Sequence, residues 1–236
     1  MKKKENIKIA LVRTWSPGNI GSVARAAKNF GFKNLVAVNQ INFNIDESRT
    51  MAAGAKDHME YFRNSNSLYE EVKSSNVVYA FSNRKRKHYK VLSPEQMAKE
   101  IASLPEESKV TILFGNETNG LNNDELDLAD KLVTIPTDPN YPSLNLSMAT
   151  MLSLYEIHKH IETVSTTKDD SYIDSEEKRI AKDQIAEIIA EKVLEKDIHK
   201  KQVLDNINML FKRMMLNKKE INFIRTIFKI IEKKLK

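Results

Sequence analysis

Short apolar runs rich in β-branched residues alternate with helical patterns up to about residue 161 of this chain. The runs that predict buried strands are residues 7–14, 35–38, 77–82, 110–114 and 132–135. The helical patterns between and after them are residues 19–30, 46–61, 67–73, 93–104, 123–129 and 146–161. Because strands and helices alternate, the chain predicts an α/β fold, a mostly parallel sheet with helices on both faces.

The composition changes after residue 163. All six glycines lie between Gly18 and Gly120, and residues 164–175 form a polar, partly acidic stretch. Glycine-free helices are predicted beyond it at 176–197, 199–215 and 217–235, the last opened by Asn217 with Glu220 three residues later. We therefore expect an α/β domain at 1–163, a linker at 164–175 and a small all-helical C-terminal extension at 176–236. Such a small extension buries little core of its own, so it should pack on the domain or on another subunit.

The composition also limits the protein class. Apolar residues make up 41% of the chain, enough for a core, but no apolar run approaches the roughly 18 residues of a membrane-spanning helix. The start of the chain does not resemble a signal peptide. Cysteine is absent, which excludes disulfides, thiolate metal sites and cysteine nucleophiles. These features predict a cytoplasmic location and no membrane partner.

The positive charge is unevenly distributed. The net charge is +6, yet residues 198–236 alone hold eleven Lys and Arg against three acidic residues, and residues 84–90 hold five basic residues in seven. Basic clusters of this kind are typical of proteins that bind a polyanion such as a nucleic acid. The alternative is a solvated, lysine-rich surface.

Four unusual loops follow predicted strands. They are residues 15–21, 81–84, 115–121 and 136–145, the last of which contains three prolines. In a parallel sheet these loops share one edge, where ligands bind. Ser143 and Asn145 precede the helix at 146, where side-chain oxygens cap free N–H groups. The sequence predicts a ligand site here, with a simple capped turn as the alternative for the last loop.

Several common sites are excluded. The chain has no Gly-Lys-Ser/Thr phosphate loop and no Gly-x-Ser-x-Gly elbow. Gly18 and Gly21 lack the first glycine of a dinucleotide fingerprint, which makes a dehydrogenase improbable. The histidines are not spaced as metal ligands, so no metal is expected. The four loops instead suit a neutral or cationic small molecule beside a polyanion.

Three segments occur in order between residues 7 and 160. They read Pro17-Gly-Asn-Ile-Gly-Ser-Val-Ala-Arg25, Leu113-Phe-Gly-Asn-Glu-Thr-Asn-Gly-Leu121 and Ile135-Pro…Tyr141-Pro-Ser-Leu-Asn-Leu-Ser147. Together they resemble the motifs of the TrmH/TrmJ-type RNA 2′-O-methyltransferases, knotted α/β enzymes of the SPOUT superfamily. Residues 210–227 resemble the helical tail of the TrmJ branch, whose members methylate the ribose of nucleotide 32 in the tRNA anticodon loop. The loop at 81–83 and Asn116 depart from the family pattern.

The resemblance implies a deep trefoil knot around the strands at 110–114 and 132–135, with S-adenosyl-L-methionine bound in it. The cofactor-binding residues that it implies are Phe81, Ser82, Asn83, Gly115, Ile135, Ser143, Leu144 and Asn145. The catalytic residues that it implies are Arg25, Asn19, Glu117, Ser143 and Asn145. Arginine is a poor base, so Arg25 is expected to position the ribose and phosphate and to stabilise the forming alkoxide.

Structural alternatives stay open for three of these residues. Arg25 could form a surface ion pair, Asn19 is expected to cap its helix, and Glu117 is expected to order its own loop through backbone N–H groups.

The resulting prediction is a homodimeric tRNA ribose 2′-O-methyltransferase. The residues expected to bind RNA are Arg25, Arg84, Lys85, Arg86, Lys87, Lys212 and Arg213. The same chemistry on ribosomal RNA is one alternative, and a catalytically silent RNA-binding protein of the same fold is another.

Overall fold

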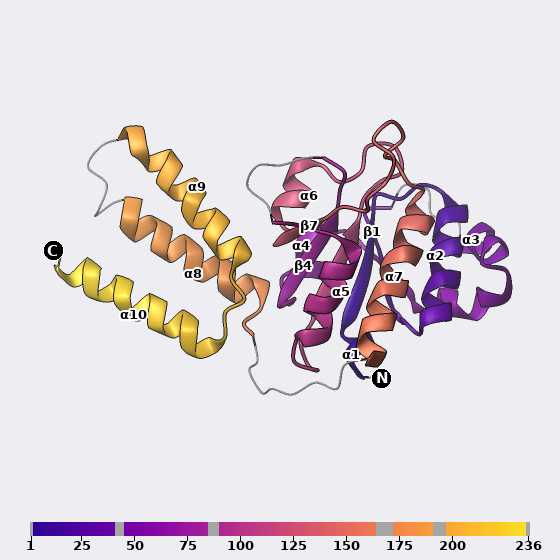
Figure 1. Ribbon diagram of the computed structural model, residues 1–236, viewed down its shortest axis with the longest axis horizontal. Helices are drawn as coiled ribbons and strands as arrows, with labels where there is room; N and C mark the ends of the chain where they lie inside the picture. Colours follow the sequence, from indigo (N-terminus) through magenta and orange to yellow (C-terminus); the bar gives the residue numbers. More distant parts are fainter. Residues whose placement is uncertain (1, 41–44, 85–89, 164–171, 191–196, 235–236) are drawn as a thin grey trace.

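A seven-stranded sheet lies at the centre of the computed structural model, which describes residues 2–40, 45–84, 90–163, 172–190 and 197–234 (Figure 1). The strand order is β3-β2-β1-β6-β4-β7-β5, and every neighbouring pair is parallel. The strands are β1 (Ile7–Val12), β2 (Asn34–Val38), β3 (Phe62–Ser65), β4 (Val77–Phe81), β5 (Val91–Leu92), β6 (Val110–Phe114) and β7 (Lys131–Val133). The predicted parallel α/β sheet is confirmed.

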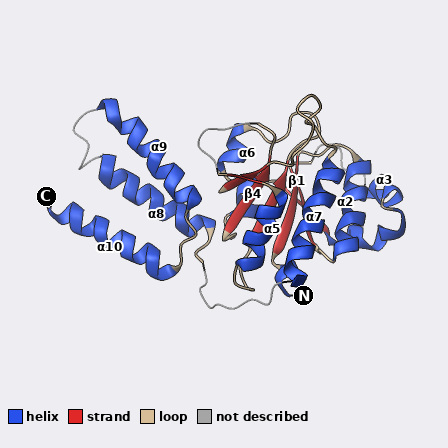
Figure 2. Ribbon diagram, in the orientation of Figure 1, coloured by secondary structure: helices blue, strands red, loops and turns tan. Residues whose placement is uncertain are grey.

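Helices cover both faces of this sheet (Figure 2). They are α1 (Lys2–Glu5), α2 (Pro17–Phe30), α3 (Ile45–Met51), the 3₁₀ helix η1 (Ala53–Tyr61), α4 (Leu68–Val72), α5 (Pro94–Ser103), α6 (Asn123–Asp127) and α7 (Leu146–Thr163). In β1, Ile9 and Leu11 face a core shared with α2, α5 and α7, whereas Ala10 and Val12 face a core shared with α4 and α6. The alternation follows from the two-residue period of a strand.

Several boundaries differ from the sequence prediction. Helix α2 begins at Pro17, and the Ser16 hydroxyl caps it by accepting from Asn19 N at 3.4 Å. Asn19 is therefore not the helix cap, and that prediction is wrong. The helix predicted at 46–61 is divided at Ala53, which has a φ of 48°. Strands β3 and β5 were not predicted, because one is polar and the other has only two residues.

The strand order brings the predicted site loops together. Strands β1, β6, β4 and β7 are consecutive neighbours, so the loops that follow them lie side by side at one edge of the sheet. Strand β7 ends at Val133, two residues earlier than predicted. Ile135 therefore belongs to the loop and not to the strand.

Three further helices, α8 (Ser175–Ile188), α9 (Asp197–Arg213) and α10 (Lys218–Lys234), lie to one side of the sheet (Figure 1). They enclose a core of their own, formed by Ile173, Ala181, Ile185, Ile207, Phe211, Leu216 and Ile221. Asn217 and Glu220 form the predicted cap of α10, with Asn217 Oδ1 accepting from Glu220 N at 2.9 Å and Glu220 Oε2 accepting from Asn217 N at 2.9 Å.

Several contacts join this helical part to the α/β part, and two of them illustrate the junction. The buried Lys178 Nζ donates to Asp130 Oδ1 at 2.6 Å, and Ser175 Oγ donates to the carbonyl oxygen of Ser75 at 2.7 Å. Most of the linker expected at 164–175 lies outside the described residues. None of the described helices is long and apolar enough to cross a membrane.

Candidate active site

A pocket of about 290 Å³ opens where the loops after β4, β6 and β7 meet. The implied cofactor residues that line it are Phe81, Ser82, Asn83, Gly115, Ile135, Ser143 and Leu144. Asn145 does not line it. The rings of Phe81 and Phe114 stack with centroids 4.5 Å apart and give the pocket an apolar wall.

Hydrogen bonds tie the loop after β4 to the proline-rich loop. Ser82 N donates to the carbonyl oxygen of Val133 at 3.0 Å, and Thr134 Oγ1 donates to that of Ser82 at 2.6 Å. Asn83 Nδ2 donates to the carbonyl oxygen of Pro142. These bonds hold the two sides of the pocket at a fixed separation.

The loop at 115–121 is ordered by Asn116. Asn116 Oδ1 accepts from Thr118 N at 2.9 Å, and Asn116 Nδ2 donates to the carbonyl oxygen of Arg13 at 2.8 Å. A Cβ at Gly115 would lie 2.3 Å from Gly120 C, so the hairpin closes only around a glycine. The sequence prediction missed Asn116, although an Asn two residues before a polar turn residue is a recognisable signal of such a turn.

Glu117 does not order its own loop, contrary to prediction. Its Oε1 accepts from Asn19 Nδ2 at 2.9 Å and from Ser16 N at 3.3 Å, and its Oε2 accepts from Trp15 N at 3.4 Å. The carboxylate therefore stabilises the loop after β1, a strand that neighbours β6. The reason is tertiary: strands β1 and β6 are adjacent, so their loops face each other.

Asn145 extends this network. Its Nδ2 donates to Asn19 Oδ1 at 2.9 Å, and its Oδ1 accepts from Ser147 N at 2.9 Å in the first turn of α7. Asn145 thus caps α7 and holds Asn19, which in turn contacts Glu117. The three side chains connect all three sequence motifs beside the pocket.

Arg13 is a second residue that the sequence prediction missed. It lies directly after β1 with a φ of 55°, and its Nε and Nη2 contact the two carboxylate oxygens of Glu125 at 2.6 and 2.8 Å. Nη2 also donates to the carbonyl oxygen of Gly120 at 3.1 Å. The hydrogen bond to Glu125 raises the pKa of Arg13. Arg13 therefore stabilises the loop at 115–121 through Gly120 and remains positively charged.

Arg25 lies on the outward face of α2, between buried Ala24 and Ala26. In the part of the chain that the structure describes, it makes no hydrogen bond or ion pair. The alternative of a surface ion pair does not describe this residue. Its guanidinium is exposed and free to bind an anion.

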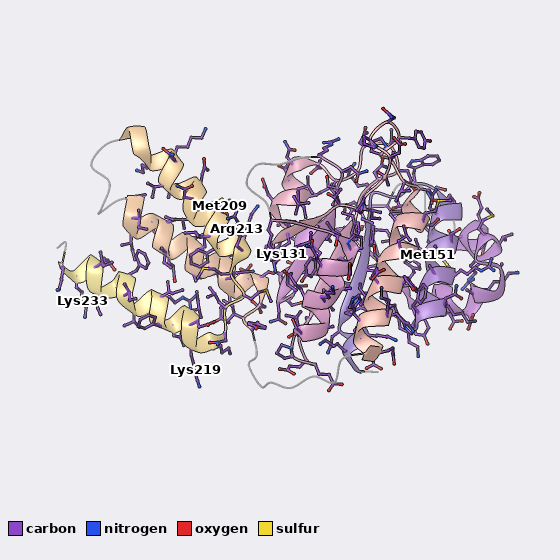
Figure 3. All side chains as sticks on the ribbon, viewed as in Figure 1. Lys131, Met151, Met209, Arg213, Lys219 and Lys233 are labelled. Carbon is purple, nitrogen blue, oxygen red and sulfur yellow. The ribbon has the colours of Figure 1, made fainter. Side chains whose placement is uncertain are left out.

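The predicted RNA-binding residues differ in accessibility. Arg84 lines the pocket and donates to the carbonyl oxygen of Asn119 at 3.0 Å, and Arg213 is exposed on α9 (Figure 3). Lys85, Arg86 and Lys87 lie outside the described residues. The prediction for Lys212 is wrong, because its side chain is only 15% exposed and contacts Asp127 at 3.5 Å. Burial also lowers the pKa of Lys212.

No cluster of His, Asp and Glu that could hold a metal ion occurs among the described residues. The pocket instead presents aromatic rings, main-chain groups, amides and hydroxyls, together with one carboxylate, Glu117, and one guanidinium, Arg84. Such a lining suits an uncharged or sulfonium-bearing organic molecule.

Comparison with known proteins gives consistent results. Residues 6–155 match the SpoU rRNA Methylase family. The tRNA (cytidine/uridine-2′-O-)-methyltransferase TrmJ of Pectobacterium atrosepticum is 30% identical over 97% of this chain and 98% of its own length. The crystal structure of TrmJ from Z. mobilis ZM4 superimposes with a TM-score of 0.74 at 28% identity, over 95% of this chain and 98% of that one. A SpoU methyltransferase from Streptomyces viridochromogenes, solved with the cofactor AdoMet, shares the fold at 21% identity and a TM-score of 0.53, over 66% of this chain and 61% of that one.

Proposed function

We propose that this chain, which belongs to the SpoU rRNA Methylase family, is a tRNA ribose 2′-O-methyltransferase of the TrmJ type. One observation carries the proposal: the similarity to TrmJ covers nearly the whole of both chains, so it includes the C-terminal helices as well as the pocket. Cytidine and uridine are the target nucleosides, as in that relative. Position 32 of the anticodon loop follows from the resemblance of the motifs.

S-adenosyl-L-methionine supplies the methyl group. The pocket fits it, because a volume of about 290 Å³ is near the lower end of the roughly 300–1,000 Å³ of small-molecule sites. Phe81 and Phe114 offer an apolar wall for an adenine ring, and Gly115 and Leu144 also line the pocket. Glu117 is the one carboxylate among the lining residues and would attract a cationic group of the ligand.

Arg25 binds the RNA in this proposal. It is exposed and unpaired within the described residues, so no protein contact has to break before it meets a phosphate. A guanidinium held against the ribose–phosphate orients the 2′-hydroxyl and stabilises the alkoxide that forms when the proton leaves. Asn19, Glu117 and Asn145 position the loops around that hydroxyl, and Ser143 lines the pocket beside them.

The proposal includes a trefoil knot around β6 and β7. Support comes from the bonds that join Ser82 and Asn83, after β4, to Thr134 and Pro142, after β7. These bonds bring the two chain segments against each other at the pocket, as a threaded arrangement requires.

A homodimer is also part of the proposal. Helix α7 exposes an apolar stripe at the spacing of one helix face, formed by Met148, Met151, Leu152 and Tyr155 (Figure 3 labels Met151). A contiguous apolar stripe of this kind marks a protein interface. Exposed basic residues of 176–236, Arg213 among them, contact tRNA phosphates. The residues of 1–163 form the catalytic domain, and the enzyme acts in the cytoplasm.

Mass spectrometry of ribose methylation tests the function directly. Transfer RNA from cells with and without the protein is digested and compared, and purified protein is incubated with tRNA and ribosomal RNA transcripts. We expect one methylated cytidine or uridine to disappear from tRNA without the protein. Methylation of ribosomal RNA transcripts alone would refute the tRNA substrate, and failure to bind the cofactor in calorimetry would refute the enzyme.

A further inference from the structure

Trp15 is a large aromatic side chain that is exposed to solvent near the pocket. It is 53% exposed, and among the described residues its indole makes no hydrogen bond and no ring contact. Its backbone N–H donates to Glu117 Oε2 at 3.4 Å, and Glu117 lines the pocket. A tryptophan that is half exposed gains only part of the free energy that full burial would give, so apolar ring surface beside the candidate active site is left available for a ligand.

The main chain around Trp15 is unusually well held. Glu117 accepts from the backbone of both Trp15 and Ser16, and Ser16 is the cap from which α2 starts toward Arg25. A side chain on such a fixed support loses little freedom when a ligand covers it, which favours binding. Tyr141 is more exposed, at 79%, but it lies in the proline-rich loop and its N–H is bonded only to that loop's own Asp138.

The reaction requires a surface for the base of the target nucleotide. When the 2′-hydroxyl faces the pocket, the attached base is left at the rim, where no base-paired partner accompanies it. Proteins that recognise unpaired RNA bases stack them on aromatic rings. Stacking tolerates different bases because every base has a π face. A stacking contact would therefore accept cytidine and uridine alike, the two nucleosides in the name of the TrmJ relative.

We propose that Trp15 is the stacking platform for the pyrimidine base of the target nucleotide. This inference rests on the proposed function and adds a substrate-binding residue that touches the base and not the ribose. Trp15 does not line the pocket, whereas Ser143 and Leu144 of the proline-rich loop do, so base and cofactor would occupy separate surfaces.

Intrinsic fluorescence tests the contact without any methyl transfer. Trp15 is the only tryptophan in the chain, so its emission reports on this position alone. The probe is an anticodon stem-loop RNA with a pyrimidine at the target position, compared with the same RNA carrying an abasic ribose there. We expect strong quenching by the first RNA and little by the second, at concentrations where fluorescence anisotropy of end-labelled RNA shows both bound. Equal quenching by the two RNAs would overturn the proposal.

Variants provide the second measurement. Trp15→Ala should weaken binding of the stem-loop roughly 5- to 150-fold, the range for loss of one base–aromatic stack, with cofactor affinity unchanged. Trp15→Phe should restore most of it, and Tyr141→Ala, the matched control, should change it less than 3-fold. Wild-type RNA affinity in Trp15→Ala would refute the stack. Dissociation of a Trp15→Ala dimer in gel filtration would also refute it, because the weaker binding would then have a structural cause. If the wild-type protein bound the RNA but methylated no tRNA, the proposed function would be refuted. The quenching experiment would still show whether Trp15 contacts the base.

Discussion

Asn19 Nδ2 and Glu117 Oε1 lie 2.9 Å apart although the two residues are separated by 98 positions in the chain. The bond joins the first turn of α2 to the loop after β6. It therefore couples the helix that carries Arg25 to the wall of the cofactor pocket.

Replacing Glu117 tests this coupling. Glu117→Ala removes the acceptor for two backbone N–H groups and for Asn19, and each lost bond to a charged acceptor costs about 1.5–3 kcal/mol. We expect kcat/KM for tRNA to fall about 100-fold or more, while Glu117→Gln, which keeps one acceptor oxygen, loses less. Steady-state kinetics check this, and equal rates for Glu117→Ala and wild type would show that the network is dispensable.

Arg25→Ala separates RNA positioning from cofactor binding. Arg25 is exposed and does not line the pocket, so the variant should lose methylation while its cofactor affinity in calorimetry stays within about 3-fold of wild type. Lys28→Ala, on the same helix, is the control and should keep most activity. A large loss of cofactor affinity in Arg25→Ala would contradict the assigned role.

Gly115→Ala should damage the pocket sterically. The added Cβ would lie 2.3 Å from Gly120 C and Leu121 N, so the loop must open. We expect cofactor affinity to fall at least 10-fold and stability to fall by about 1–3 kcal/mol. Gly54→Ala is the matched control, because a Cβ there meets nothing within 4 Å. Calorimetry and urea unfolding of both variants measure the difference, and identical behaviour would contradict the prediction.

Glu71 makes stability depend on acid pH. Its carboxylate is hydrogen-bonded to Arg63 and, at 3.0 Å, to Lys8, and these contacts lower its pKa from 4.5 to about 2. A lowered folded-state pKa stabilises the fold above the unfolded pKa near 4.5, and this stability is lost as pH falls toward 2. The contribution is roughly 3 kcal/mol, at about 1.4 kcal/mol per pKa unit. Urea unfolding between pH 6 and 3 should show that the free energy of unfolding depends less on pH in Glu71→Gln than in wild type. An unchanged slope would argue against the role of Glu71.

Lys178→Met tests the junction between the helical part and the sheet. It leaves the Asp130 carboxylate, bonded to Val78 N at 2.8 Å, without its buried cation. Removing one partner of a buried pair costs about 3–5 kcal/mol. Hydrogen exchange should then rise in α8 more than in α2, whereas Lys201→Ala, an exposed control, should change neither. Restored stability in Lys178→Met with Asp130→Asn would identify the unpaired charge as the cause.

The sequence predicted the sheet and most of the pocket wall for local reasons. Each of the five predicted strands lies in a mainly apolar run, and most of the pocket residues lie inside contiguous motifs. The roles of Asn19 and Glu117 could not be assigned that way, since their partners lie about a hundred residues away. Lys212 is a second residue whose environment depends on tertiary packing. Its position in a basic stretch predicted exposure, and only packing against α6 reveals its burial.

Helix α7 has two sides with different occupants. Leu146 and Ala149 line the pocket, while Met148, Met151 and Leu152 form part of the exposed stripe. A second subunit on that stripe and a cofactor in the pocket would therefore bind opposite faces of one rigid element. Thermodynamic linkage is reciprocal. If the bound cofactor changes the subunit association constant by some factor, association changes the cofactor affinity by the same factor. If the cofactor favours association, dilution of the protein should weaken cofactor binding as it dissociates the dimer.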